Sequence, residues 1–228
     1  MIIAKNIAKI EERIQKACCK TGRKRSDITL MAVTKFVPVN KIEEAYKSGI
    51  NCFGESRVKE AAEKLEVFMK EHNDTRFHLI GSLQRNKAKQ AALFFDCIQS
   101  VDRDELLLDL KKYSLLRSSP LEILLELHTG EESKSGYRDL SDLLKAAELA
   151  VKSEKLKPAG LMTMAPYTTD ADLIRSSFRQ LAAAQKELEK YFPDENWTCL
   201  SMGMSNDYEI AIDEGSTLLR IGSAIFKE

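Results

Sequence analysis

The sequence predicts an α/β protein, a single (β/α)8 barrel of the TIM type with an extra helix at its N-terminus. Two observations predict this fold: short apolar runs alternate strictly with amphipathic segments, and eight such pairs can be counted. Strict alternation of strand and helix gives a parallel sheet covered by helices. Eight units within 228 residues favour a closed barrel.

A doubly wound open sheet is the alternative for the same alternation. That fold carries a glycine-rich phosphate loop after its first strand. Here the first strand is followed by Phe36-Val37-Pro38-Val39, which contains no glycine. Since no linker rich in Pro, Ser or Gly divides the chain, one domain is expected over residues 1–228.

The elements follow in order from the pattern of apolar residues. The first helix is expected over 1–20, where isoleucines recur at helical spacing from residue 3. Strands, short and rich in apolar and β-branched residues, are expected at 28–35, 51–55, 77–81, 97–101, 121–129, 157–164, 198–204 and 217–222. Helices are expected between them at 39–48, 56–72, 86–94, 103–116, 138–153, 170–191 and 206–213.

The composition of the chain disfavours several classes of function. The 35 basic and 35 acidic side chains balance, so the basic runs 20–25 and 85–89 give only weak support to a nucleic-acid-binding barrel. The five cysteines form no C-x-x-C pair, which disfavours a disulfide framework and a metal site. With no signal-peptide core and no run of transmembrane length, a cytoplasmic monomer without membrane or nucleic-acid partners is expected.

The first strand ends in a single amine, Lys35. Two interpretations of this lysine are open: a solvated strand terminus, or a partly desolvated amine. Desolvation disfavours the ammonium form and lowers the pKa, and a neutral amine attacks an aldehyde to form a Schiff base. Because barrel active sites lie at the C-terminal ends of the strands, the other strand ends decide between the two.

The last two strand ends predict an anion site. The seventh strand runs through Ser201-Met202-Gly203-Met204-Ser205 and the eighth through Arg220-Ile221-Gly222-Ser223. Glycine lets backbone N–H groups approach an anion closely, and serine hydroxyls add donors. Barrels often build a phosphate site from these two loops, so phosphate binding is favoured over a packing role for the glycines.

Three other strand ends carry polar groups whose role stays open. His78, inside the third strand, is either a satisfied core residue or a site residue. Glu55 could pair with Lys35 or Arg220, or cap the helix that follows. The fifth strand runs into the polar segment 131–136.

Seven segments then carry a family resemblance, in chain order: Ala32–Lys35, Phe53–Glu55, Phe77–Lys87, Ser133–Gly136, Gly160–Met164, Leu200–Ser205 and Arg220–Phe226. They resemble the pyridoxal phosphate homeostasis proteins, which look like the N-terminal barrel of alanine racemase standing alone. The resemblance implies that Lys35 holds pyridoxal 5′-phosphate (PLP) as a Schiff base. It implies that Ser201, Met204, Ser205, Ile221, Gly222 and Ser223 surround the phosphate, that Arg220 faces the pyridine nitrogen, and that His78 and Ser56 are further cofactor-binding candidates. Ser56 stands where the family usually has asparagine.

The resemblance also bears on turnover. Arginine is permanently charged and cannot accept a proton, so Arg220 should leave the ring nitrogen unprotonated and the cofactor a weaker electron sink. Alanine racemase adds a tyrosine from a second domain, and no such domain is expected here. The expected function is vitamin B6 homeostasis: PLP is held without turnover and passed to apo-enzymes that depend on it, with no catalytic residue assigned. An amino-acid racemase or lyase is the alternative, favoured if Cα hydrogens exchanged in deuterium oxide in a Lys35-dependent way.

Overall fold

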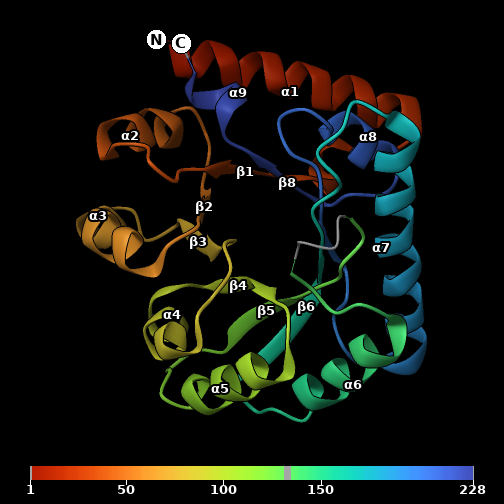
Figure 1. Ribbon diagram of the computed structural model, residues 1–228. Coiled ribbons are helices and arrows are strands. Elements are labelled where there is room, and N and C mark those ends of the chain that lie inside the picture. The colour runs from red at the N-terminus through yellow and green to blue at the C-terminus, as the bar shows by residue number, and fades with distance from the viewer. Residues whose placement is uncertain (1, 131–134, 228) are drawn as a thin grey trace.

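The fold is a closed barrel of eight parallel strands, which confirms the predicted (β/α)8 architecture (Figure 1). This computed structural model describes residues 2–130 and 135–227. The strands are β1 Thr29–Val33, β2 Cys52–Glu55, β3 Arg76–Leu79, β4 Cys97–Val101, β5 Leu121–Glu126, β6 Leu156–Met162, β7 Cys199–Ser201 and β8 Leu218–Ile221. Each strand pairs with the next along the chain, and β1 pairs with β8 to close the ring.

Helices surround the barrel and follow the strands in alternation (Figure 1). They are α1 Ile2–Thr21, α2 Val39–Lys47, α3 Val58–Glu71, α4 Ala88–Phe94, α5 Asp104–Ser114, α6 Leu140–Val151, α7 Ala171–Tyr191, α8 Tyr208–Asp213 and α9 Ser223–Phe226. The one-turn helix α9 is absent from the expected elements, because four residues are too few to show a helical period. Among the residues described, none of the helices is long and apolar enough to cross a membrane.

The extra N-terminal helix is present and lies across the outside of the barrel beside α8 and α9 (Figure 1). Its buried face consists of Ile3, Ile7, Ile10, Ile14 and Cys18. These residues recur every three or four positions, so one stripe of the helix is apolar and packs on the barrel. The Asn6 side-chain amide also donates to the carbonyl of Ile225, 3.0 Å away, which ties α1 to α9.

Six of the eight strands end earlier than expected, whereas β2 and β4 end at the predicted residues 55 and 101. For example, β1 stops at Val33 instead of residue 35, and β7 stops at Ser201 instead of residue 204. The ladder of hydrogen bonds between two strands ends where the neighbouring strand ends, and the local sequence does not encode that position. The apolar residues past the ladders, such as Met164 and Met204, line a cavity at the mouth of the barrel.

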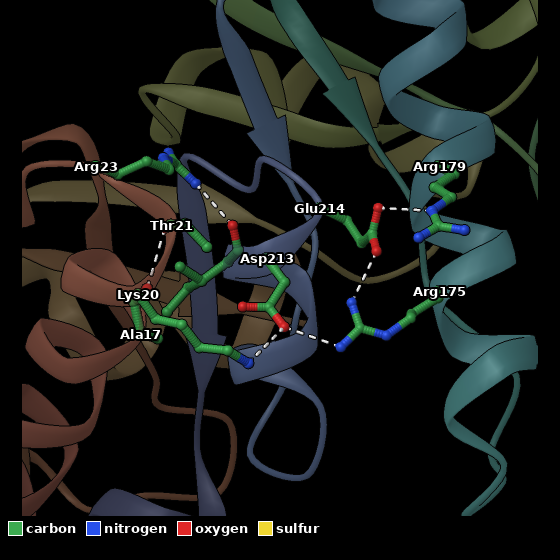
Figure 2. A network of polar contacts seen from close by, with 9 residues as sticks. Ala17, Lys20, Thr21, Arg23, Arg175, Arg179, Asp213 and Glu214 are labelled. Carbon is green, nitrogen blue, oxygen red and sulfur yellow. Dashed lines mark hydrogen bonds and ion pairs between the residues drawn. The ribbon is translucent and has the colours of Figure 1, made fainter.

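A charged network braces the segment between β7 and β8 from outside (Figure 2). Arg175 on α7 contacts Asp213 at 2.9 Å and Glu214 at 2.8 Å, and Arg179 contacts Glu214 at 2.9 Å. Lys20, at the end of α1, reaches Asp213 at 3.7 Å. The basic run 20–25 is therefore partly engaged within the fold, and the network fixes α8, the helix that carries the loop after β7.

Candidate functional site

Lys35 sits on a tight turn that leaves the end of β1. The Val37 N–H donates to the Thr34 carbonyl at 2.9 Å, which closes a β-turn with Lys35 and Phe36 at its centre. Phe36 has a φ of +62°, a conformation that is rare and strained for a bulky residue. The Lys35 side chain is exposed and borders the cavity. The protein therefore presents this amine at the barrel mouth from a backbone held in one conformation.

A partly buried ion pair holds this turn from behind. The Glu55 carboxylate, 1% exposed, accepts from the Thr34 hydroxyl at 2.6 Å and from the Lys64 ammonium at 2.6 Å. Lys64 also donates to the Thr34 carbonyl at 2.8 Å. Glu55 thus pairs with Lys64 rather than with Lys35 or Arg220, the partners considered from the sequence. Its position next to the turn makes it a support for the lysine.

The loops after β7 and β8 meet beside this turn. The Ala224 N–H donates to the Ser205 hydroxyl at 3.3 Å, and the Arg220 N–H donates to the Gly203 carbonyl at 2.9 Å. Gly203 has a φ of +95°, and a Cβ there would lie 2.6 Å from that of Ala211. Only glycine allows the loop to bend this way and still pack against α8.

A cavity of about 560 Å³ opens between these elements, within the size range of small-molecule sites. Seven of the ten predicted site residues border it: Lys35, Ser56, Met204, Ser205, Arg220, Gly222 and Ser223. An amine, several hydroxyls and a buried guanidinium therefore share one opening. Their arrangement places the Lys35 amine and the loops after β7 and β8 on the same cavity, as the parallel barrel predicts.

The other three predicted residues lie behind the cavity wall. Ile221 is fully buried in the outer core, because side chains alternate along a strand and Arg220 takes the inward position. Ser201 points into the barrel and accepts from Arg220 at 2.6 Å. His78 is 6% exposed and contacts Gln99 at 2.8 Å inside the barrel. The side chains of these three residues do not border the cavity, and their role as cofactor-binding residues stays a prediction.

Arg220 forms part of the cavity wall while remaining 4% exposed. Its terminal nitrogens donate to the Ser201 carbonyl at 2.6 Å and to the Thr163 carbonyl at 2.7 Å. Burial lowers the pKa of Arg220 to about 10, and the nearby carboxylates of Asp207 and Glu126 act in the opposite direction. The guanidinium is still charged at neutral pH, so the cavity contains a fixed cation.

Glu126 is a cavity residue that the sequence analysis missed. It ends β5, is 2% exposed, and accepts from the Ser135 hydroxyl at 2.9 Å. Burial raises the pKa of this carboxyl despite the Ser135 hydrogen bond. Since β5 lies across an eight-stranded ring from β1, Glu126 faces the Lys35 side of the mouth. An acid at the C-terminal end of the apolar run that follows Glu122 was the signal that could have identified it. The nearby residues 131–134, including Ser133 and Lys134 of the family motif, lie outside the described residues.

The buried imidazole of His78 predicts a pH-dependent stability. Burial, and then the charge of Arg76, lowers the pKa of His78 from 6.5 to about 3. Between these values the unfolded chain binds a proton that the folded chain does not. The free energy of unfolding should therefore fall as the pH drops below about 6.5, by up to about 1.4 kcal/mol per pH unit. Urea unfolding of the wild type and of His78→Asn between pH 7 and pH 5 measures this, and a difference between the two that does not change with pH would contradict it.

The residues present fit an aldehyde with an anionic group better than they fit a metal ion. Within the described part of the chain, no cluster of three His, Cys, Asp or Glu side chains could hold a metal ion. Lys35 supplies an amine for an aldehyde, and Ser205, Gly222 and Ser223 supply small, donor-rich walls for a phosphate. When bound, PLP would supply the aldehyde and an electron-accepting ring.

Several known proteins resemble this chain over nearly its full length. Residues 4–228 match the family described as alanine racemase, N-terminal domain. A pyridoxal phosphate homeostasis protein of Vibrio cholerae is 38% identical over 99% of this chain and 96% of its own length. The structure of PipY from Synechococcus elongatus PCC7942, solved with PLP bound, superposes with a TM-score of 0.86 at 31% identity, over 98% of this chain and 99% of PipY. An alanine racemase of Clostridium difficile 630 matches with a TM-score of 0.71 at 10% identity, covering 56% of that enzyme, and so shares the fold alone.

Proposed function

Because the chain belongs to the pyridoxal phosphate homeostasis family, within the alanine racemase N-terminal domain, we propose that it binds PLP and serves the homeostasis of vitamin B6. The observation that carries this proposal is the shared cavity, where Lys35 borders the same space as Ser205, Gly222 and Ser223. Lys35 would hold the aldehyde as a Schiff base, and the loops after β7 and β8 would hold the phosphate. The chain works as one PLP-binding domain over residues 1–228.

The cavity favours holding PLP over transforming an amino acid. A carboxylate beside the pyridine nitrogen would keep that nitrogen protonated and strengthen the electron sink. By the family resemblance the group beside that nitrogen is Arg220 instead, which borders the cavity and is a cation without acceptor capacity. Its charge at neutral pH disfavours protonation of the ring nitrogen. The bound cofactor is therefore a weak electron sink, which suits a carrier.

The rim of the cavity suits the release of PLP to other proteins. The Phe36 side chain, next to Lys35, is 74% exposed, and the Tyr167 side chain at the rim is 88% exposed. Exposed aromatic side chains around a binding site are typical of surfaces that contact partners. We assign PLP-dependent apo-enzymes to this role, with the protein acting as a monomer. The five free cysteines suit the reducing cytoplasm.

Reduction with borohydride tests the proposal on the wild-type protein. After incubation with PLP and reduction, mass spectrometry of the digested protein should find one pyridoxyl phosphate, carried by Lys35. The reduced bond cannot hydrolyse, so the label survives digestion. Lys41, at the entrance of the next helix, is the internal control because it also lies near the mouth. Labelling spread evenly over many lysines would show only nonspecific reaction with an aldehyde and would reject the proposal.

A further inference from the structure

A chain of buried hydrogen bonds runs from Arg220 across the interior of the barrel. Arg220 donates to the Ser201 hydroxyl at 2.6 Å, the Ser201 hydroxyl donates to the Gln99 side-chain oxygen at 2.6 Å, and the Gln99 amide nitrogen contacts His78 Nδ1 at 2.8 Å. The four residues come from β8, β7, β4 and β3, and each is at most 6% exposed. Among these four, Arg220 alone borders the cavity.

The chemistry of arginine fixes the direction of every bond in this chain. A guanidinium can only donate, so the Ser201 oxygen must accept from Arg220. The Ser201 hydroxyl then donates its own O–H to Gln99. Gln99 then accepts through its oxygen and must donate through its nitrogen to His78. His78 Nδ1 is therefore the acceptor, and the single proton of a neutral imidazole lies on Nε2.

The end of the chain is unusual. His78 Nε2 is buried and has no hydrogen-bond partner among the residues described. A buried polar group without a partner costs free energy, so a histidine placed here solely for packing would be a poor choice. Its Nδ1 provides what an apolar side chain could not, an acceptor that holds the Gln99 amide in one orientation. If that amide turned over, its NH2 group would face the Ser201 hydroxyl.

We propose that Gln99 and His78 are positioning residues, which hold the Arg220 guanidinium through Ser201 in a single orientation toward the ring of the bound ligand. This inference rests on PLP being that ligand. It extends the proposed function because two residues without access to the cavity determine how the cation in its wall is presented. Without the chain, Arg220 would keep its contacts with the Ser201 and Thr163 carbonyls, but the Ser201 hydroxyl would no longer be held in the orientation that accepts from it.

The first test examines the chain of hydrogen bonds in the protein without PLP, and so does not depend on the proposed function. Nitrogen-15 NMR distinguishes the two neutral forms of an imidazole, and the protein sequence contains only three histidines to assign. His78 should be neutral with its proton on Nε2 throughout the neutral pH range. Gln99→Leu removes the donor to Nδ1 and should shift the His78 nitrogen signals. A wild-type His78 protonated on Nδ1, or signals unchanged in the variant, would overturn the proposal.

The second test measures how breaking the chain of hydrogen bonds affects bound PLP. Gln99→Leu should still form the Schiff base, with a shifted absorbance maximum and about tenfold weaker PLP binding, because one hydrogen bond in a charged network is lost. Gln185→Leu is the matched control: the Gln185 amide donates to the Trp197 carbonyl at 2.7 Å on the outside of the barrel, and its loss should leave both readouts unchanged. An identical spectrum and affinity in Gln99→Leu would refute the positioning role.

A pair of His78 variants separates positioning from packing. His78→Asn keeps an acceptor near the place of Nδ1 and should retain the wild-type spectrum of bound PLP. His78→Leu fills the same space without an acceptor and should show the spectrum of Gln99→Leu. Equal spectra for the two His78 variants would contradict the proposal. If the wild type formed no Schiff base, the proposed function would fail, and the NMR measurement would still decide whether the chain exists.

Discussion

Replacing Lys35 with alanine is expected to abolish the absorbance band of the Schiff base completely and to leave PLP removable by dialysis. The amine is the nucleophile, and no serine or glycine of the cavity wall can replace it. The fold should persist, because Lys35 is exposed and lies outside the β1 ladder. The free energy of unfolding should change by no more than about 0.5 kcal/mol. Absorbance titration with PLP and urea unfolding measure the two effects.

Two further variants separate the nucleophile from its charge. Lys35→Arg keeps a cation at the mouth but cannot form the bond, so it too should lack the band. Lys41→Ala removes a neighbouring amine on α2 and should keep the band. A band that persisted in Lys35→Ala would mean that another lysine carries the aldehyde, and the assignment of Lys35 would then be wrong.

The barrel was predictable because its pattern is local. Each strand is a short apolar run and each helix an amphipathic segment, so their alternation is visible without any knowledge of contacts. The strand ends were less predictable, because a ladder stops where its neighbour stops. Lys35 shows this: the apolar run reaches it, yet β1 ends at Val33 and the lysine belongs to a turn.

The site was predictable as far as the topology determines it. A parallel barrel brings all C-terminal strand ends to one face, so Lys35 and the two serine-rich loops had to share a mouth. Which side chains face that mouth depends on the register. Ser201 and Ser205 look alike in sequence, but the first turns into the barrel and the second borders the cavity. Gln99 stood out in no motif, since only tertiary structure places it between Ser201 and His78.

Gly160→Ala is expected to cost several kcal/mol and to leave much of the protein unfolded or insoluble. Gly160 lies in β6 opposite Cys199 of β7, with a φ of +149°. A Cβ there would lie 1.9 Å from the Cys199 carbonyl oxygen, which is backbone and cannot rotate away. The free energy of unfolding of such domains is only about 5–15 kcal/mol, so forcing two strands apart would remove a large share of it. Soluble yield and urea unfolding measure the loss.

Gly215→Ala is the matched control, because it isolates backbone strain from collision. Gly215 also has a positive φ, +97°, but nothing lies within 4 Å of an added Cβ. Its replacement should cost only about 1–2 kcal/mol. The difference between the two variants measures how tightly β7 must pack on β6. Since β7 carries Ser201, the anchor of Arg220, any soluble Gly160→Ala protein should also bind PLP more weakly than Gly215→Ala. Equal stability and equal binding in the two variants would mean that β7 can shift without cost to the site.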